Sequence, residues 1–467
     1  MLTSYFNPTQ PTPIMPAAPH RHTALLDDMV QALRAGRYAA GARLPTHRAF
    51  ARQHGVALAT ASKVYAELER RGLVVGETGR GTFVREWQRE AERHSLADWR
   101  LQATLPQPAP VDLAFNYPHT PNAGQLLEDA LQALRQAGPM DRLMEPQPIG
   151  GGLPEREAVA RHLQRSGLSV PAQQVLLVGG AQQGLACALS ALFQPGDVVV
   201  VDELTYPGFI GLAQTQSIEL QALRWNSQGP DLNQLERLLQ QRPVKALFTM
   251  PTLHNPTGWV MDLASRERLV ALARQHKTWL IEDASYAFLA ADAPLPLAAL
   301  APERTVYVSG LSKSVGGGVR LGFMVPPPQW VDRCERTLRA IAWSQPTLMS
   351  ALGAHWLECG VVHALEQQKR QDARAKQQLA LRCLAGLRLQ SHPDSFFVWV
   401  RLPEAVRAEP LTVRLAELGI AVTPSSAFAV AASYPHAIRL NLGAASLEVL
   451  EHALPVVRET IEAMELA

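Results

Sequence analysis

Cysteine is scarce in this 467-residue chain, and long apolar runs are absent. The four cysteines are Cys187, Cys334, Cys359 and Cys383. They lie far apart and none belongs to a CxxC pair, which argues against a disulfide framework or a zinc site and is typical of a reducing compartment. The stretch 175-VLLVGGAQQGLACALSALF-193 is interrupted by two glutamines, so the sequence predicts no membrane span.

A secretion signal is also missing from the start of the chain. The first 19 residues hold five prolines but no basic patch that leads into an apolar segment. This composition predicts a disordered tail over residues 1–19, and we expect a cytoplasmic protein.

The chain has no large excess of one charge, since its formal net charge is +2. The balance is uneven, because residues 21–85 carry eleven Lys and Arg against five Asp and Glu, a net +6. A basic segment is compatible with a solvated surface and only weakly favours nucleic acid. The chain is too long for one compact core, so two or more domains are expected.

The basic N-terminal segment has the pattern of a winged helix-turn-helix. Apolar spacing and glycine stops predict three helices followed by a hairpin. The helices are expected over about 23–36, 47–54 and 58–71, and the hairpin strands over 73–75 and 82–84. Thr46 should cap the second helix, and the third should bury Ala61, Val64, Tyr65 and Leu68. This order of elements is typical of a DNA-binding domain.

The same segment resembles the GntR family of bacterial repressors. The resemblance lies in 41-GARLPTHRAFARQHGV-56, 64-VYAELERRGLV-74 and 79-GRGTFV-84. It implies that the third helix enters the major groove of operator DNA, with contacts from Arg48, Thr60, Lys63 and Arg80. Leu58 stands where the family usually has an arginine, so base reading there is an apolar contact with a thymine methyl group or is absent. A helical bundle with a surface hairpin is the alternative.

The next segment is charged and then proline-rich, ending in 104-TLPQPAP-110. Such a composition is typical of a semi-rigid linker. The predicted organisation is therefore a tail (1–19), a DNA-binding domain (20–86), a linker (87–110) and a large domain (111–465).

The large domain alternates predicted strands with amphipathic stretches. The expected strands are 175–179, 197–202, 245–250, 279–284 and 305–310. The alternation predicts an α/β fold with a mostly parallel sheet, and the site of such a sheet lies beyond the carboxyl ends of its strands. Polar segments follow the strands there: 179-GGAQQG-184, 203-ELTYPG-208, 251-PTLHNPTG-258, 283-DASY-286 and 309-SGLSK-313. Taken singly, each could be an ordinary turn or a helix cap.

Together and in this order, these segments resemble fold type I pyridoxal 5′-phosphate (PLP) enzymes, the aspartate aminotransferase superfamily, over about residues 111–460. The resemblance implies a smaller C-terminal α+β subdomain and a Schiff-base lysine, Lys313. Asp283 would pair with the pyridine nitrogen, Tyr286 and Asn255 with the phenolate oxygen, and Tyr206 would stack on the ring. The implied phosphate ligands are Ala181, Gln182, Ser309, Ser312 and Arg320. Arg439 would grip the carboxylate of a substrate or effector.

Three residues depart from the family pattern around the phosphate. Gly310 and Ala181 stand where hydroxyl residues are common, and Met144 stands where a tyrosine is expected to reach the partner subunit's phosphate. Gly317-Gly318 also replaces the usual Pro-Gly. We therefore expect PLP to be held loosely, and a serine at position 310 to tighten it if the backbone there accepts a side chain.

A GntR-type head joined to an aminotransferase-like domain resembles the MocR regulators. The resemblance implies a homodimeric transcriptional regulator whose large domain senses PLP or an amino compound. Two alternatives stay open on the sequence alone: a working aminotransferase that carries a DNA-binding head, and a DNA-binding protein with an empty, decayed pocket.

Overall fold

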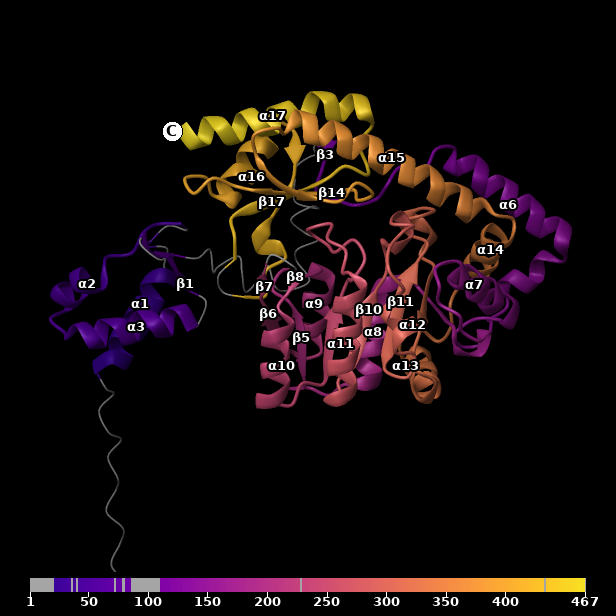
Figure 1. The fold of residues 1–467 in the computed structure, drawn as a ribbon, viewed down its shortest axis with the longest axis horizontal. Helices are drawn as coiled ribbons and strands as arrows, with labels where there is room; N and C mark the ends of the chain where they lie inside the picture. The colour runs from indigo at the N-terminus through magenta and orange to yellow at the C-terminus, as the bar shows by residue number, and fades with distance from the viewer. Residues whose placement is uncertain are drawn as a thin grey trace, which may run out of the picture. The chain divides into compact units, whose positions relative to one another are not determined.

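The computed structural model describes residues 21–34, 37–38, 41–70, 73–77, 80–84, 110–226, 229–431 and 434–466. The chain divides into two compact units, Met1–Arg93 and His94–Ala467 (Figure 1). The predicted tail and nearly all of the predicted linker lie outside the described residues.

The first unit is a winged helix-turn-helix, as predicted. Its elements are α1 (Arg21–Arg34), α2 (His47–His54), α3 (Leu58–Arg70), β1 (Val74–Glu77) and β2 (Gly81–Val84), the two strands pairing antiparallel. The Thr46 hydroxyl accepts a hydrogen bond from the Ala49 amide at 3.2 Å, and Gly55 ends α2 in the left-handed region at φ 61°. α3 buries the four predicted residues against α1 and α2.

A seven-stranded sheet in the order β4-β12-β11-β10-β9-β5-β6 forms the centre of the second unit. Its strands are β4 (Leu176–Val178), β5 (Val198–Asp202), β6 (Glu219–Leu223), β9 (Ala246–Thr249), β10 (Trp279–Asp283), β11 (Thr305–Gly310) and β12 (Gly322–Val325). Only β12 runs antiparallel to its neighbours. The predicted mostly parallel sheet is confirmed, whereas β6 and β12 were not predicted, because β6 is a partly polar edge strand and β12 is a short apolar run without alternation.

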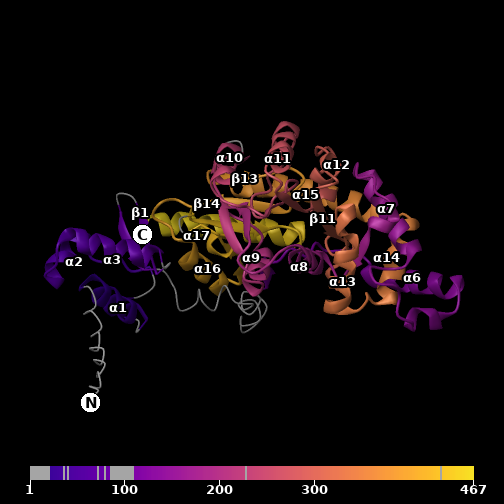
Figure 2. The ribbon, with the colours of Figure 1, turned by 90° about the horizontal axis from the view of Figure 1, so that it is seen from below.

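Helices cover both faces of this sheet (Figure 2). They are α6 (Ala123–Ala137), α7 (Leu153–Arg165), α8 (Ala181–Leu192), α9 (Pro207–Thr215), α10 (Leu232–Gln241), α11 (Leu263–Gln275), α12 (Leu297–Leu300), α13 (Val331–Ala342) and α14 (Thr347–Glu358). Successive side chains of a strand point to opposite faces of the sheet, so neighbouring residues of β11 belong to different hydrophobic cores. Val306 and Val308 pack with α8, α9 and α13, and Tyr307 packs with α7 and α14.

A smaller C-terminal subdomain carries a four-stranded antiparallel sheet in the order β13-β14-β17-β16 (Figure 1). Its elements are β13 (Arg388–Ser391), β14 (Phe397–Arg401), β15 (Ile420–Ala421), β16 (Thr423–Pro424), β17 (Ala437–Asn441), α15 (Val361–Cys383), α16 (Ala408–Glu417) and α17 (Leu447–Leu466). β3 (Val111–Asp112) pairs in parallel with β15, so the first described residues of the unit belong to this subdomain. The short elements are β7 (Trp225–Asn226), β8 (Gly229–Pro230), η1 (Met140–Met144), η2 (Ala172–Gln174), η3 (Ala287–Leu289), η4 (Gly317–Val319), η5 (Pro328–Trp330) and η6 (Ser425–Ala427).

Helix α15 joins the two parts of the second unit. Over 23 residues it extends about 34 Å. Val362 and Leu365 near its start pack in the core of the large sheet, whereas Ala373 and Ala380 pack in the core of the small subdomain. The helix therefore positions the small subdomain against the strand ends.

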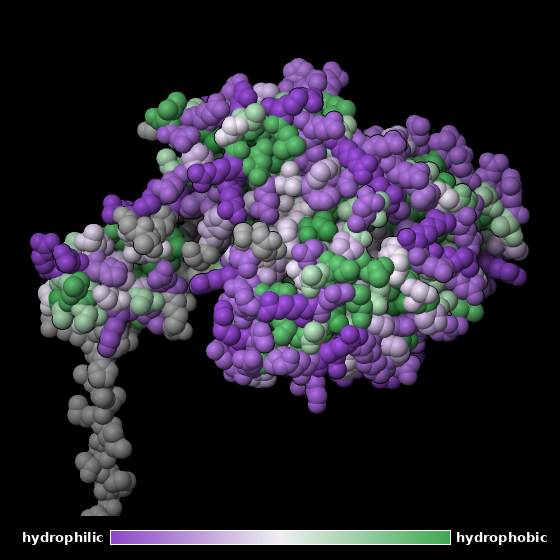
Figure 3. Space-filling view, viewed as in Figure 1, coloured by the Kyte–Doolittle hydropathy of each residue, from purple (hydrophilic) through white to green (hydrophobic). Residues whose placement is uncertain are grey.

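The face of the second unit seen in Figure 3 is mostly hydrophilic, with smaller apolar areas between the polar ones. Among the described residues no helix is both long enough and apolar enough to span a bilayer.

Candidate functional site

The predicted site residues of the second unit come together beyond the carboxyl ends of neighbouring strands. Asp283 is the last residue of β10, and Lys313 follows β11 by three residues. Asn255 lies in the loop after β9. Because these strands are adjacent and parallel, their loops meet at one edge of the sheet.

Lys313 is half-buried and lies in a positively charged environment. Its ammonium donates to the Asn116 carbonyl at 2.5 Å and lies 4.3 Å from the centre of the Tyr117 ring. Burial lowers the pKa of Lys313 to about 8, with help from Arg439 and against the opposing effect of Asp283. A lowered pKa raises the fraction of neutral amine, the form that reacts with an aldehyde.

Asp283 is 5% exposed and is held by the following turn. One carboxylate oxygen accepts from the Ser285 amide at 2.9 Å and from the Ser285 hydroxyl at 2.6 Å. Burial raises the pKa of Asp283, while Ser285 and Lys313 act in the opposite direction. The bound oxygen fixes the orientation of the carboxylate, so that its second oxygen can pair with a cation.

Two tyrosines and an arginine line the same site from different elements. Tyr286 packs edge-on to Phe397 of β14 at 4.9 Å, and burial raises the pKa of its phenol. Tyr206 precedes α9, and burial followed by Asp283 raises its pKa. Arg439 of β17 donates to the Asn255 side-chain oxygen at 2.9 Å, and burial lowers its pKa to about 10. The contact links the predicted carboxylate-binding arginine to the predicted cofactor-binding asparagine.

A cradle of backbone groups lies next to Lys313, where β4 passes into α8. Gly180 has φ +92°, and a Cβ there would lie 2.7 Å from the Arg320 guanidinium, which donates to the Gly179 carbonyl at 2.9 Å. Helix α8 begins at Ala181 with no side-chain cap, so the N–H groups of its first residues can donate hydrogen bonds to an anion. The cradle and Arg320 together could hold a phosphate group.

The side chains of three predicted phosphate ligands differ in what they can offer. The Ser309 hydroxyl donates to the Ala284 carbonyl at 3.2 Å, and the Gln182 amide donates to the Gly208 carbonyl at 2.9 Å. The Ser309 hydroxyl and the Gln182 amide are therefore already bonded to protein carbonyls. Ser312 accepts from Arg320 at 3.4 Å, which places its hydroxyl next to the guanidinium. Backbone amides and Arg320 thus carry more of the candidate phosphate site than the sequence indicated.

The condition under which a serine at position 310 was expected to tighten PLP is not met, for a steric reason. A Cβ on Gly310 would lie 2.9 Å from both the Gly322 Cα and the Leu321 carbonyl oxygen. Both obstacles are backbone atoms of the neighbouring strand region and cannot rotate away. Gly310 is needed for the close approach of β11 to β12.

A segment that sequence reasoning missed crosses the site, and we call residues 114–120 the strap. Its backbone carbonyls accept from two site cations: Arg439 bonds to Ala114, and Lys313 bonds to Asn116. Lys369 of α15 donates to the Thr120 hydroxyl at 2.8 Å and to the Lys313 carbonyl at 3.2 Å, which ties the strap to the Lys313 loop. No charged residue marks 114-AFNYPHT-120, so the sequence carried no signal for this role.

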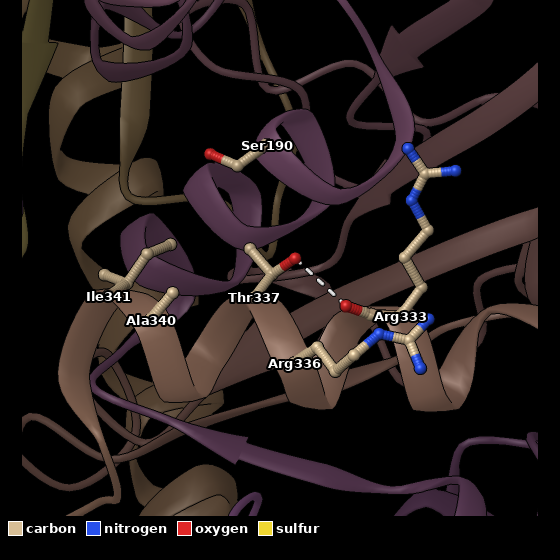
Figure 4. A pocket seen from close by; sticks show the side chains of 6 residues that line it. All are labelled: Ser190, Arg333, Arg336, Thr337, Ala340 and Ile341. Carbon is tan, nitrogen blue, oxygen red and sulfur yellow. Dashed lines mark hydrogen bonds between the residues drawn. The ribbon is translucent and has the colours of Figure 1, made fainter.

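The open pocket drawn in Figure 4 is separate from this site. It has a volume of about 560 Å³ and lies between α8 and α13. Its lining consists of Ser190, Arg333, Arg336, Thr337, Ala340 and Ile341. None of these was predicted as a site residue, and the Thr337 hydroxyl bonds within its own helix to the Arg333 carbonyl.

The first unit presents its predicted DNA contacts on two helices and the wing. Arg48 of α2 and Lys63 of α3 are exposed, Thr60 and Arg80 are half-buried, and Leu58 is 47% exposed. The Tyr65 hydroxyl donates to the Pro45 carbonyl at 2.7 Å and so fixes α3 to the start of α2. Arg48 and Lys63 therefore project from a rigid helix pair.

Comparison with known sequences identifies both units. The family described as aminotransferase class I and II matches residues 108–457, about three quarters of the chain. The chain belongs to the aminotransferase class I and II family. The family of bacterial regulatory proteins named gntR matches residues 23–84, which confirms the predicted GntR-type head on this aminotransferase-like chain.

Relatives named as HTH-type transcriptional regulators match nearly the whole chain. The uncharacterised HTH-type transcriptional regulator YdeF of Bacillus subtilis is 26% identical over 445 residues, which cover 94% of each chain. The regulator YjiR of Escherichia coli is 25% identical over 479 residues, which cover 96% of this chain and 99% of the relative. The predicted MocR-type regulator is thereby confirmed: this aminotransferase-family chain is a DNA-binding transcriptional regulator.

Solved structures share the fold of the second unit. Kynurenine aminotransferase of Pyrococcus horikoshii superimposes with a TM-score of 0.73 at 23% identity, covering 80% of this chain and 95% of the other. LysN, an α-aminoadipate aminotransferase of Thermus thermophilus, superimposes with a TM-score of 0.72 at 22% identity, covering 82% and 99%. The cofactor of this family is PLP, and Lys313, the carboxylate of Asp283 and the glycine cradle fit its aldehyde, pyridine nitrogen and phosphate.

Proposed function

We propose that this PLP-dependent regulator senses PLP, or PLP together with an amino compound, through the site around Lys313. Binding of these ligands controls operator binding by the GntR-type head. The observation that carries the proposal is the convergence of Lys313, Asp283, Arg320 and Arg439 at one edge of the sheet, where Asp283 and Arg439 are buried, Lys313 is half-buried and Arg320 is exposed. An empty, decayed pocket would have no reason to keep Asp283 and Arg439 buried there, because burial of charge is costly unless it serves a partner.

Each residue has a role that its surroundings support. Lys313 supplies the amine for the cofactor aldehyde, and at a pKa of about 8 roughly a tenth of it is neutral at pH 7. The free oxygen of Asp283 would pair with the pyridine nitrogen, and Tyr286 and Asn255 would serve the phenolate oxygen. Tyr206 would stack on the ring.

The anionic groups of the ligands meet the positive groups of the site. Arg320 and the first amides of α8 hold the phosphate, and Arg439 holds a carboxylate as a bidentate pair. When bound, PLP supplies an aldehyde that captures amines and a ring that withdraws electrons. The protein contributes orientation, since Lys313 and Arg439 both donate hydrogen bonds to backbone carbonyls of the strap.

We further propose a cytoplasmic homodimer that binds operator DNA through Arg48, Thr60, Lys63 and Arg80. Large apolar side chains stay exposed around α6, η1 and α7, including Met144 at 87%, Leu153 at 49% and Leu127 at 41%. A second copy of the chain would cover such a surface. Met144 would then lie at the subunit boundary without a hydroxyl to offer to the phosphate.

The test is an operator-binding titration on the full chain, first stripped of PLP, then with PLP, then with PLP and a panel of amines and amino acids. We expect operator affinity to change with PLP or with one of the additions, and the visible absorption of bound PLP to change in the same samples. An Arg320→Ala variant should require a higher PLP concentration for the same response. Operator affinity that is identical in all states would contradict sensing.

A working aminotransferase is the second candidate, and the convergence of Lys313, Asp283 and Arg439 favours it as well. The two functions separate in one measurement. Release of a keto acid from an amino acid over many turnovers indicates an enzyme, whereas a spectral change without turnover indicates a sensor.

A further inference from the structure

The strap carries one buried amide side chain, that of Asn116, next to the site. Asn116 is 5% exposed, and within the described part of the chain neither its side-chain oxygen nor its side-chain nitrogen has a hydrogen-bond partner. Its backbone carbonyl is occupied by the Lys313 ammonium. The residue therefore offers one bonded group and two unbonded ones in a buried location.

The surroundings of the Asn116 side chain are those of the site. Burial raises the pKa of the Tyr286 phenol, and a side-chain hydrogen-bond interaction with Asn116 that falls outside normal hydrogen-bond geometry acts in the opposite direction. A Cβ on Gly443 would lie 2.9 Å from the Asn116 side-chain oxygen and 3.3 Å from that of Asn441. Asn441 and Arg439 stand two residues apart on β17 and so share a face of the small sheet.

On the face of β17 that carries Arg439 and Asn441, two side-chain nitrogen atoms also lack hydrogen-bond partners among the described residues. They are the Nε of Arg439 and the Nδ2 of Asn441. Together with Asn116, the site leaves three donors (Arg439 Nε, Asn116 Nδ2 and Asn441 Nδ2) and one acceptor (Asn116 Oδ1). A buried amide without partners is unfavourable, and a ligand that supplies them relieves this.

This inventory selects a chemical class of ligand. Carboxylate oxygens are acceptors only, and an amino group donates. A ligand with both groups satisfies the three donors and the one acceptor, whereas an amine without a carboxylate leaves the donors unpaired.

We propose that the Asn116 carboxamide is a ligand-recognition group, which donates to the carboxylate and accepts from the amino group of an amino acid effector gripped by Arg439. The proposal rests on the proposed effector-sensing function and adds both the residue and the ligand class to it.

The experiment is calorimetric titration of the PLP-loaded full chain with each of the twenty L-amino acids and with the amine that remains when its carboxylate is removed. Two variants are compared with the wild type. Asn116→Asp keeps the shape and the acceptor but replaces the donor by a charge that repels a carboxylate, and Asn116→Leu removes both. Asn122→Asp is the matched control, because Asn122 is exposed and its side chain does not cap α6.

We expect the tightest-binding amino acid to lose at least about tenfold in affinity in both Asn116 variants, the loss of a hydrogen bond to a charged group. The loss should be larger in Asn116→Asp than in Asn116→Leu, whereas the matching amine should bind Asn116→Asp no more weakly than wild type. Retention of the visible absorption of bound PLP and of the wild-type thermal transition of the second unit reports that each variant is folded.

The outcomes separate the two proposals. Wild-type affinity for the amino acid in both Asn116 variants overturns the role of Asn116 and leaves effector sensing intact. Binding of amines but not of amino acids by the wild type overturns the ligand class. Binding of neither, with no response of operator affinity to PLP, overturns the effector function and the inference together.

Discussion

Replacing Gly310 by serine tests whether the backbone contact between β11 and β12 controls the cofactor site. The added Cβ would lie 2.9 Å from the Gly322 Cα and the Leu321 carbonyl oxygen, about 0.5 Å closer than ordinary contact at 3.4 Å. Neither atom can move without shifting β12, which pairs with both β11 and β4. The strands must therefore separate, and a buried hydroxyl is added at the same time.

Overpacking of this kind lowers the free energy of unfolding by about 1–3 kcal/mol. In thermal unfolding followed by circular dichroism, we expect the transition of the large unit to fall by roughly 1–4 °C. The PLP dissociation constant, measured by titration of stripped protein, should rise, because Lys313 follows Gly310 by three residues and moves with it.

Gly318→Ser is the matched control in the same loop, since nothing lies within 4 Å of a Cβ there. It should leave the thermal transition and the PLP dissociation constant unchanged. An unchanged transition with tighter PLP binding in Gly310→Ser would refute this reasoning.

Lys313→Ala should remove the visible absorption of the PLP adduct and the effector response while operator binding persists; a borohydride-reducible adduct at this site in the variant would show that another amine reacts. The pKa of Lys313 is lowered, so the unfolded state binds more protons between about pH 8 and the ordinary lysine value, and this lysine's contribution to stability rises with pH in that window. The rate of PLP uptake by stripped protein should accordingly rise with a midpoint near pH 8, and a pH-independent rate between pH 7 and 9 would argue against a reactive neutral amine. Arg48→Ala and Lys63→Ala should each weaken operator binding and reduce its salt dependence by about one unit of slope, with PLP binding as the unaffected control. Unchanged operator affinity in both would mean that α2 and α3 do not face the DNA.

The sequence by itself determined the order of elements and the chemistry of the cofactor site. Apolar periodicity placed α1 to α3 and five strands of the large sheet, because each of these depends on neighbours within the same segment. Lys313, Asp283 and Asn255 could be named because they stand at or after strand ends in segments that resemble fold type I PLP enzymes, and Arg439 because its segment matches the carboxylate-binding arginine of the same superfamily. The GntR-type head was equally visible, since its helices, turn and wing are contiguous in the chain.

Only the tertiary structure decided how groups from distant segments meet. The strap begins some two hundred residues before Lys313, and its role depends on backbone carbonyls, which every residue possesses and no sequence pattern marks. Gly310 looked like a missing hydroxyl in the sequence, and only the approach of Gly322 shows that a side chain has no room there. Asn116 looked like an ordinary loop residue, and only its burial without a partner distinguishes it. Local pattern specifies what each segment can form, whereas packing between segments decides which polar groups are satisfied and which are left for a ligand.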